Sequence, residues 1–127
     1  YDLAVYEKSP QEVVTTPQMY LADFEANRFD AFLAVSDENG EILGLALYYK
    51  AYSTWKGPYY WLEDFVVKDA YRGAGIGKQL FETMIAFVKS ENTFMKWEVL
   101  DWNTPAIHFY EKYKAEFLKE WITCRLR

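Results

Sequence analysis

Three glycines in five residues, Gly73, Gly75 and Gly77, separate a run of strand-forming residues from a helical pattern. Glycine has no Cβ atom, so the backbone N–H groups of such a turn can point at a ligand. The start of a helix adds a partial positive charge. With Arg72 and Lys78 beside the glycines, the turn indicates a phosphate site. The alternative is an ordinary strand-to-helix turn, for which one or two glycines suffice.

The spacing of these glycines excludes two common phosphate loops. A nucleotide-triphosphate loop requires Gly-Lys-Ser/Thr at its end, but Gln79 follows Gly77 and Lys78, and Arg72 stands where the first glycine belongs. A dinucleotide fingerprint requires a glycine three places after a Gly-x-Gly pair. The two pairs of this turn give Lys78 and Leu80 at that place, and antiparallel hairpins precede the turn.

The elements around the turn follow from hydrophobic periodicity and from turn residues. Asn39-Gly40 suits a tight hairpin turn, so the strands on either side should pair antiparallel. Thr16-Pro17 predicts the start of a helix, with the threonine as its N-cap. We expect strands over residues 31–35, 42–49, 59–67, 96–100 and 117–126, and helices ending near residue 6 and spanning 16–24, 78–89 and 104–113. This order predicts an α/β (α+β) domain with a central mixed, mostly antiparallel, twisted sheet and helices on both faces.

Composition narrows the class of protein further. The chain has 127 residues, 51% of them apolar, enough for one domain with a core of its own. One cysteine and one histidine exclude a disulfide framework and a structural zinc site, and we expect no metal. The net charge of −5 argues against nucleic acid and favours a cationic ligand. No apolar run reaches a membrane span of about 20 residues, so we expect a cytoplasmic protein without a membrane partner.

The pattern Arg72-x-x-Gly75-x-Gly77 resembles the GNAT family of acetyl-coenzyme A-dependent N-acetyltransferases. Within that family, four further stretches look like the spermidine/spermine N-acetyltransferase group, above all its thialysine-acetylating members. These stretches are Tyr-Ser-Thr-Trp-Lys-Gly (52–57), Trp-Leu-Glu-Asp-Phe-Val-Val (61–67), Tyr-Arg-Gly-Ala-Gly-Ile-Gly (71–77) and Val-Leu-Asp-Trp-Asn (99–103). The resemblance implies one GNAT domain over residues 1–127, without the family's N-terminal strand, and a homodimer.

The resemblance also implies which residues contact acetyl-coenzyme A, the cosubstrate. The glycine turn would hold the pyrophosphate with its backbone amides. A backbone N–H of the bulged strand before the turn would stabilise the thioester oxygen, which needs no reorganisation. The expected coenzyme-binding residues are Phe65, Val66, Val67, Arg72, Gly73, Ala74, Gly75, Ile76, Gly77, Lys78, Asn103, Pro105 and Ala106.

Acetyl transfer to an amine requires a base, because a lysine-like amine has a pKa of about 10. Glu63 is the candidate base, since Trp61, Leu62 and Phe65 predict a largely buried strand that would raise the pKa of its carboxyl. The alternative is a solvated glutamate on an edge strand. Strand alternation predicts that the neighbouring Asp64 points to the opposite face, so that one of the two acids faces the cleft.

The leaving thiolate requires a proton donor, and Tyr110 is the candidate general acid. It lies in Asn-Thr-Pro-Ala-Ile-His-Phe-Tyr (103–110), similar to the stretch that carries the family's acid. A phenol of pKa about 10 is protonated at neutral pH and can donate to a thiolate. With 11 tyrosines in the chain, the alternative is a core tyrosine. We expect His108 to lie in solvent or at a rim, and Cys124 to serve packing.

A small cationic amine is the predicted substrate, because carboxylates and aromatic rings together suit an alkylammonium. Ser53-Thr54 stands where polyamine-specific members carry Asp-Pro, which favours a lysine-like amine. Lys114 replaces the family's usual glycine in the turn after Tyr110. Alternatives are acetylation of a protein N-terminus or lysine, and a non-catalytic coenzyme A-binding module. The expected substrate contacts are Tyr6, Glu7, Trp55, Glu63 and Asp64, with Glu98 and Glu120 as further acids.

Overall fold

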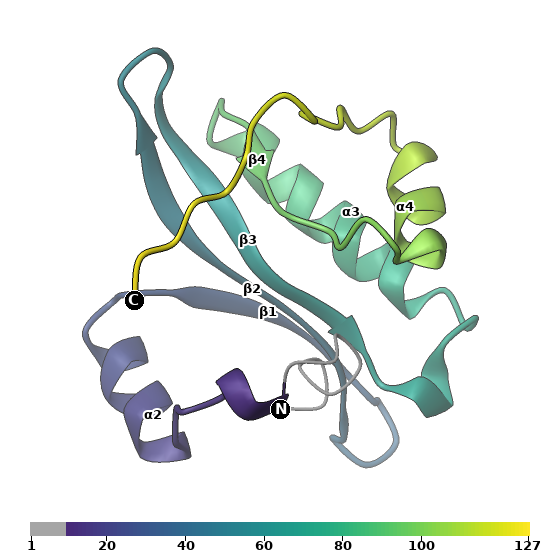
Figure 1. The fold of residues 1–127 in the computed structure, drawn as a ribbon. Helices are drawn as coiled ribbons and strands as arrows, with labels where there is room; N and C mark the ends of the chain where they lie inside the picture. Colours follow the sequence, from purple (N-terminus) through teal and green to yellow (C-terminus); the bar gives the residue numbers. More distant parts are fainter. Residues whose placement is uncertain (1–9) are drawn as a thin grey trace.

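A mixed sheet forms the centre of the protein, as the sequence predicts, but within residues 10–127 it has four strands where five were expected. The computed structural model describes residues 10–127. The strands are β1 (Asp30–Val35), β2 (Ile42–Ser53), β3 (Gly57–Val67) and β4 (Met95–Lys96), in the order β1-β2-β3-β4. The first two pairs are antiparallel and β3 pairs parallel with β4. The Asn39-Gly40 turn joins β1 to β2, with Gly40 at a φ of 73° (Figure 1).

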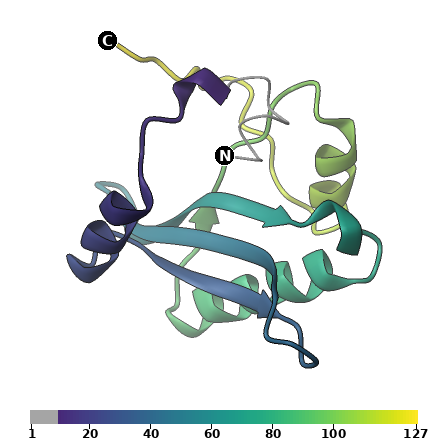
Figure 2. The same ribbon diagram turned by 90° about the horizontal axis from the view of Figure 1, so that it is seen from below.

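Within residues 10–127, three α-helices accompany the sheet, one before β1 and two after β3 in the chain. The helices are α2 (Pro17–Glu25), α3 (Ile76–Ser90) and α4 (Thr104–Glu111), with 3-10 turns η1 (Pro10–Glu12) and η2 (Asp69–Tyr71). Helix α3 lies along one face of the sheet, and η1 and the C-terminal segment lie on the opposite side (Figure 2). None of the helices in residues 10–127 is both long enough and apolar enough to cross a membrane.

The core lies between the sheet and α3. Helix α3 is amphipathic, and its apolar positions recur every three or four residues, which is why one face enters the core. Phe81 and Met84 are its most deeply buried side chains. The ring of Phe81 also packs edge-on against Trp97 and Phe109, so α4 is fastened to the same core. The remaining buried residues are Ala46, Tyr48, Tyr60, Leu62, Leu80, Val88 and Tyr110.

A β-bulge interrupts the pairing of β2 with β3. Tyr48 pairs with Leu62 and Leu47 pairs with Asp64, which leaves Glu63 as the extra residue in β3. A bulge of this kind breaks the alternation of side chains along a strand. Leu62 is buried and Phe65 packs against Phe81, so both side chains lie on the α3 side with two residues between them.

The C-terminal half departs from the predicted strands in two places. The strand expected over residues 96–100 is only two residues long, because the chain leaves β3 after Lys96. The strand expected over residues 117–126 is wrong: the segment is irregular apart from a turn, and its apolar side chains are exposed except for Phe117, which is half-buried against the core. Its alternation of apolar and polar residues is typical of a strand, but it has no neighbouring strand to pair with among the described residues.

Tyr48 supplies a test of the packing between the sheet and α3. Burial, followed by the charge of Asp30, raises the pKa of the Tyr48 phenol to about 12 from a reference of 10.0. The pKa of Tyr48 is higher in the folded protein than in the unfolded chain. The protonated phenol therefore contributes fully to the free energy of unfolding below pH 10, and this contribution is lost as the pH rises through about 12. In urea titrations across this range, we expect the free energy of unfolding to fall less steeply in Tyr48→Phe than in the wild type. Substitution of the exposed Tyr52 by Phe is the control, and equal slopes for all three proteins would contradict the assignment.

Candidate active site

A cleft of about 250 Å³ opens where β3 and β4 part. The two strands pair at Tyr60 with Met95 and at Trp61 with Lys96, and the chain after Lys96 then turns away. Beyond this point the edge of β3 faces the cleft, and α4 closes its far end. The lining residues are Trp61, Leu62, Glu63, Asp64, Phe65, Trp97, Glu98, Val99, Asn103, Ala106 and Tyr110.

The bulge brings two adjacent carboxylates to the cleft. Both Glu63 and Asp64 line it, so the prediction that Asp64 points away from Glu63's face is wrong. The reason is the extra residue at Glu63, which removes the alternation on which that prediction relied. The Trp61 indole Nε1–H donates a hydrogen bond to Glu63 Oε1 over 3.1 Å, which fixes the direction of that carboxylate.

Asp64 is more buried than its neighbour Glu63. The flanking Trp61, Leu62 and Phe65 are buried or half-buried, as expected, but the Glu63 side chain itself is exposed. Asp64 is half-buried opposite Leu47, and burial raises the pKa of its carboxyl. Burial thus makes the Asp64 carboxyl a weaker acid than a carboxyl in water.

A third acidic residue, Glu98, also lines the cleft. Glu98 lies just after the point where β4 ends, and the hydroxyl of Thr123 donates to its Oε2 over 2.6 Å. The pKa of Tyr49 is raised by burial first, and then by the charges of Glu63, Tyr59 and Glu98. The cleft thus carries a concentrated negative potential, which attracts a cation.

Tyr110 lies at the end of the cleft formed by α4. Only 7% of the residue is exposed, and its ring packs against Trp97 and Phe81 at centroid distances of 5.1 and 5.6 Å. Helix α4 begins with Asn103, whose side chain accepts a hydrogen bond from Ala106 N over 3.4 Å. The sequence placed Glu63 and Tyr110 in one site, and both line one cleft in the structure.

Two glycines give the glycine turn a left-handed backbone conformation. Gly73 and Gly75 have φ angles of 84° and 80°, in the left-handed region that favours glycine. Gly75 is the N-cap of α3 and provides no side-chain cap, whereas Thr16 and Asn103 cap α2 and α4. A Cβ atom on Gly73 or Gly75 would meet no atom within 4 Å, so the approach to the turn is open.

Arg72 follows η2 and is turned back toward the end of β3. Its Nε–H donates to the Val67 carbonyl over 3.3 Å, and its guanidinium forms an ion pair with Asp69 at 3.1 Å. These contacts hold the side chain beside the entrance of the glycine turn. Lys78 is exposed in the first turn of α3.

Replacement of Gly75 by alanine is expected to weaken coenzyme binding without blocking the turn sterically. An alanine at a φ of 80° is disfavoured by about 1–2 kcal/mol, so the turn would relax away from its present shape. We expect the KM for acetyl-coenzyme A to rise about tenfold, as measured by initial rates. Gly40→Ala, at a φ of 73° in the β1–β2 turn, is the matched control and should leave that KM unchanged. Equal KM values for wild type and Gly75→Ala would contradict a role for the turn.

Several other predicted residues lie away from the cleft or outside the described part of the chain. Trp55 is 84% exposed at the tip of the β2–β3 hairpin and does not line the cleft. Glu120 lies in an exposed turn of the C-terminal segment. Tyr6 and Glu7, and the helix expected to end near them, lie outside the described residues.

Three smaller expectations have mixed outcomes. His108 is exposed, as predicted, but Cys124 is exposed as well, so the packing role expected for it is wrong. The strand that should have buried this cysteine does not form. Lys114 adopts a φ of 59°, so it takes the left-handed conformation that glycine has more readily, and Ala115 N then donates to Tyr110 O over 3.3 Å. The turn after Tyr110 therefore forms despite the substitution.

Trp97 was not predicted to belong to the site. Its ring packs against both Tyr110 and Phe81, and it lines the cleft beside Glu98. The sequence signal was the apolar pattern of residues 96–100, which we attributed to a regular strand. Because that strand ends at Lys96, its continuation becomes a wall of the cleft.

The chain belongs to the acetyltransferase (GNAT) family, which it matches over residues 3–114. It is an N-acetyltransferase, and acetyl-coenzyme A is the cosubstrate that this family uses. The predicted fold class and family are confirmed.

Characterised relatives extend over nearly the whole chain. A thialysine N-epsilon-acetyltransferase of Caenorhabditis elegans is 32% identical over 99% of this chain and 80% of its own length. An L-ornithine N5-acetyltransferase of Arabidopsis thaliana is 31% identical over 94% of this chain and 59% of its own length. The crystal structure of an aminoglycoside acetyltransferase from an uncultured soil metagenomic sample, in complex with trehalose, shares the fold. Its TM-score is 0.79 at 17% identity, over 98% of this chain and 83% of that one.

Proposed function

We propose that this enzyme transfers the acetyl group of acetyl-coenzyme A to a primary amine of a small cationic substrate, a thialysine-like amino acid or a di- or polyamine. The amine attacks the thioester directly within a ternary complex. The observation that carries the proposal is the acid-lined cleft next to the glycine turn. Glu63, Asp64 and Glu98 line it, and no lysine or arginine of residues 10–127 does. Such a cleft favours an ammonium ion over a neutral or anionic substrate.

Glu63 and Asp64 are proposed to receive the amine together. Asp64, set into the wall of the cleft, stabilises the ammonium form on arrival. Glu63 takes the proton, because its exposed carboxylate can pass that proton on to bulk water. The hydrogen bond from Trp61 keeps Glu63 directed along the cleft while the nitrogen lone pair becomes available.

The cosubstrate is proposed to lie along the edge of β3, with its diphosphate on the glycine turn. Backbone amides of residues 72–78 bind the phosphate oxygens, and the N-terminus of α3 adds its dipole. A backbone N–H of Phe65, Val66 or Val67 donates to the carbonyl oxygen as negative charge develops there. Asn103 and Ala106 line the cleft at the start of α4, and Pro105 lies between them in the chain.

Tyr110 is proposed to complete the transfer as general acid. When the bond between the acetyl carbon and the sulfur breaks, the sulfur takes the electron pair and the phenol supplies a proton, which yields the free thiol. The ring contacts with Trp97 and Phe81 hold the phenol at the end of the cleft. The products are the acetylated amine and coenzyme A.

The names of the relatives support a small amine as substrate, since they include acetyltransferases of thialysine and ornithine. Acetylation of a protein N-terminus or lysine is the competing function, and a coenzyme A-binding module without catalysis is the other. A cytoplasmic location stays a prediction. The exposed Tyr52 and Trp55 of the β2–β3 hairpin support the expected homodimer.

Release of free thiol from acetyl-coenzyme A distinguishes these functions in one assay. The substrates to compare are thialysine, ornithine, spermidine, an aminoglycoside and a lysine-containing peptide, at equal concentrations. We expect thialysine or ornithine to have the highest kcat/KM, followed by spermidine. A preference for the peptide would favour protein acetylation, and binding of coenzyme A without any thiol release would favour a non-catalytic module.

A further inference from the structure

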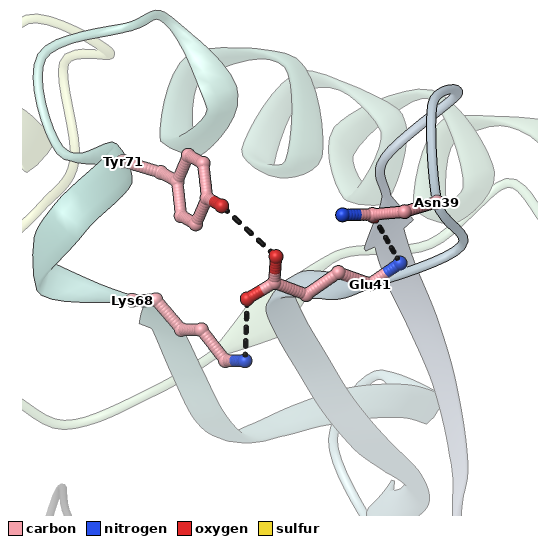
Figure 3. Close-up of polar contacts among 4 residues, drawn as sticks. All are labelled: Asn39, Glu41, Lys68 and Tyr71. Atoms are coloured by element: carbon pink, nitrogen blue, oxygen red, sulfur yellow. Dashed lines mark hydrogen bonds and ion pairs between the residues drawn. The ribbon is translucent and has the colours of Figure 1, made fainter.

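A polar network joins the β1–β2 turn to the segment that enters the glycine turn. The carboxylate of Glu41 accepts a hydrogen bond from the Tyr71 phenol at Oε2 over 2.9 Å, and its Oε1 lies 3.2 Å from Lys68 Nζ. The Asn39 side chain accepts from the backbone N–H of Glu41 over 2.9 Å. Figure 3 shows that Glu41 reaches from the turn to both partners at once. We call Glu41, Lys68 and Tyr71 the Glu41 clamp.

The two partners of Glu41 bracket the short helical turn η2. Lys68 immediately precedes η2 and Tyr71 is its last residue, directly before Arg72. Lys68 is also tied through its backbone, because its N–H donates to Leu43 O over 2.9 Å. The clamp therefore fixes the chain at both ends of η2, immediately before the glycines begin.

The pKa shifts of Glu41 and Tyr71 are consistent with the hydrogen bond between them. The hydrogen bond from Tyr71, followed by that from Lys68, lowers the pKa of the Glu41 carboxyl, so the ionised form is favoured. The same hydrogen bond raises the pKa of the Tyr71 phenol, which keeps the phenol protonated as a donor. Both partners thus hold the protonation states that the contact needs at neutral pH.

We infer that Glu41 is a positioning residue for the cosubstrate: through Tyr71 and Lys68 it holds η2, and thereby the glycine turn, in the shape that binds a diphosphate. This inference rests on the proposed role of the glycine turn. Glu41 itself lies outside the cleft, where Glu63 and Tyr110 are proposed to act. Its contribution is to binding of the cosubstrate and not to the chemical step.

The physical reason is the flexibility of the segment that the clamp restrains. Gly73 and Gly75 have φ angles open to few other residues, and the unrestrained chain visits many conformations there. If only a fraction of the molecules hold the competent turn, the apparent affinity for the diphosphate falls by that fraction. Loss of the clamp should therefore raise the KM for the cosubstrate and leave kcat unchanged.

The test compares two acetyl donors, acetyl-coenzyme A and acetyl-pantetheine, which has the same thioester but no diphosphate. For Glu41→Ala we expect the KM for acetyl-coenzyme A to rise about three- to tenfold, with an unchanged kcat and unchanged kinetics with acetyl-pantetheine. Glu41→Gln keeps an acceptor for Tyr71 and should recover part of the loss. Tyr71→Phe provides a second, milder variant that keeps the ring.

Asp23→Asn is the matched control, because it removes another exposed ion pair, Asp23 with Arg28 at 3.1 Å, far from the turn in the chain. It should change neither donor's KM. A Glu41→Ala enzyme with unchanged KM, or with equal losses for both donors, overturns the positioning role of Glu41. A wild type that uses the two donors equally well overturns the diphosphate site itself, and the clamp with it.

Discussion

Tyr110→Phe is expected to lower kcat about 10²- to 10⁴-fold while the Kd for coenzyme A stays roughly constant. The substitution removes only the phenolic oxygen, and a phenylalanine ring can keep the contacts with Trp97 and Phe81. Without a proton donor at the end of the cleft, the thiolate must leave as an anion. Turnover by thiol release and coenzyme binding by calorimetry together separate this effect from a packing defect.

Tyr113→Phe is the control for this prediction. Tyr113 follows three residues later, its hydroxyl donates to Glu82 over 3.1 Å, and neither residue lines the cleft. Its ring also packs against Phe81, so the two substitutions perturb the same core. We expect the Tyr113→Phe enzyme to keep near wild-type turnover. A Tyr110→Phe enzyme with wild-type kcat would remove Tyr110 from the mechanism.

Removal of the carboxylate pair is the second change with a large expected effect. We expect Glu63→Gln to lower kcat by about 10²-fold or more, since it removes the proposed base but keeps an acceptor for Trp61. Asp64→Asn should act mainly on the KM for the amine, because it removes a charge that stabilises the bound ammonium. The measurement is a steady-state titration of the amine at saturating acetyl-coenzyme A.

Asp37→Asn, in the β1–β2 turn, changes the net charge by the same amount and serves as the control for long-range electrostatics. It should leave both parameters unchanged. If Asp64→Asn lowers kcat and Glu63→Gln does not, the base is Asp64, the more buried of the two carboxylates. In that case Asp64 would be the base and Glu63 would bind the ammonium, and the site itself would be unchanged.

The sheet could be predicted because its signals are local. The Asn39-Gly40 turn, the apolar runs on either side and Thr16-Pro17 each specify a short segment, and the structure has the hairpin and the capped helix at those positions. Local signals were not sufficient to decide whether residues 117–126 form a strand. Its apolar pattern is local, but a strand exists only if a neighbouring strand pairs with it.

The sequence predicted which residues belong to the site better than it predicted how they are arranged. Glu63 and Tyr110 meet in one cleft although 46 residues separate them in the chain. The family resemblance implied a bulged strand before the turn but not that Glu63 is the extra residue, because the position of a bulge is defined by the register of the partner strand. The Glu41 clamp was not predicted either, because it joins residues about 30 apart in the chain whose contact depends on the fold.

The central claim is that the turn over residues 72–78 binds the diphosphate of the cosubstrate. Titration of the folded protein with coenzyme A by isothermal calorimetry tests it most directly, with Gly75→Ala as the comparison. The account predicts saturable binding at one site per chain, weakened about tenfold by the substitution. Failure of the folded wild type to bind coenzyme A at millimolar concentration would contradict it.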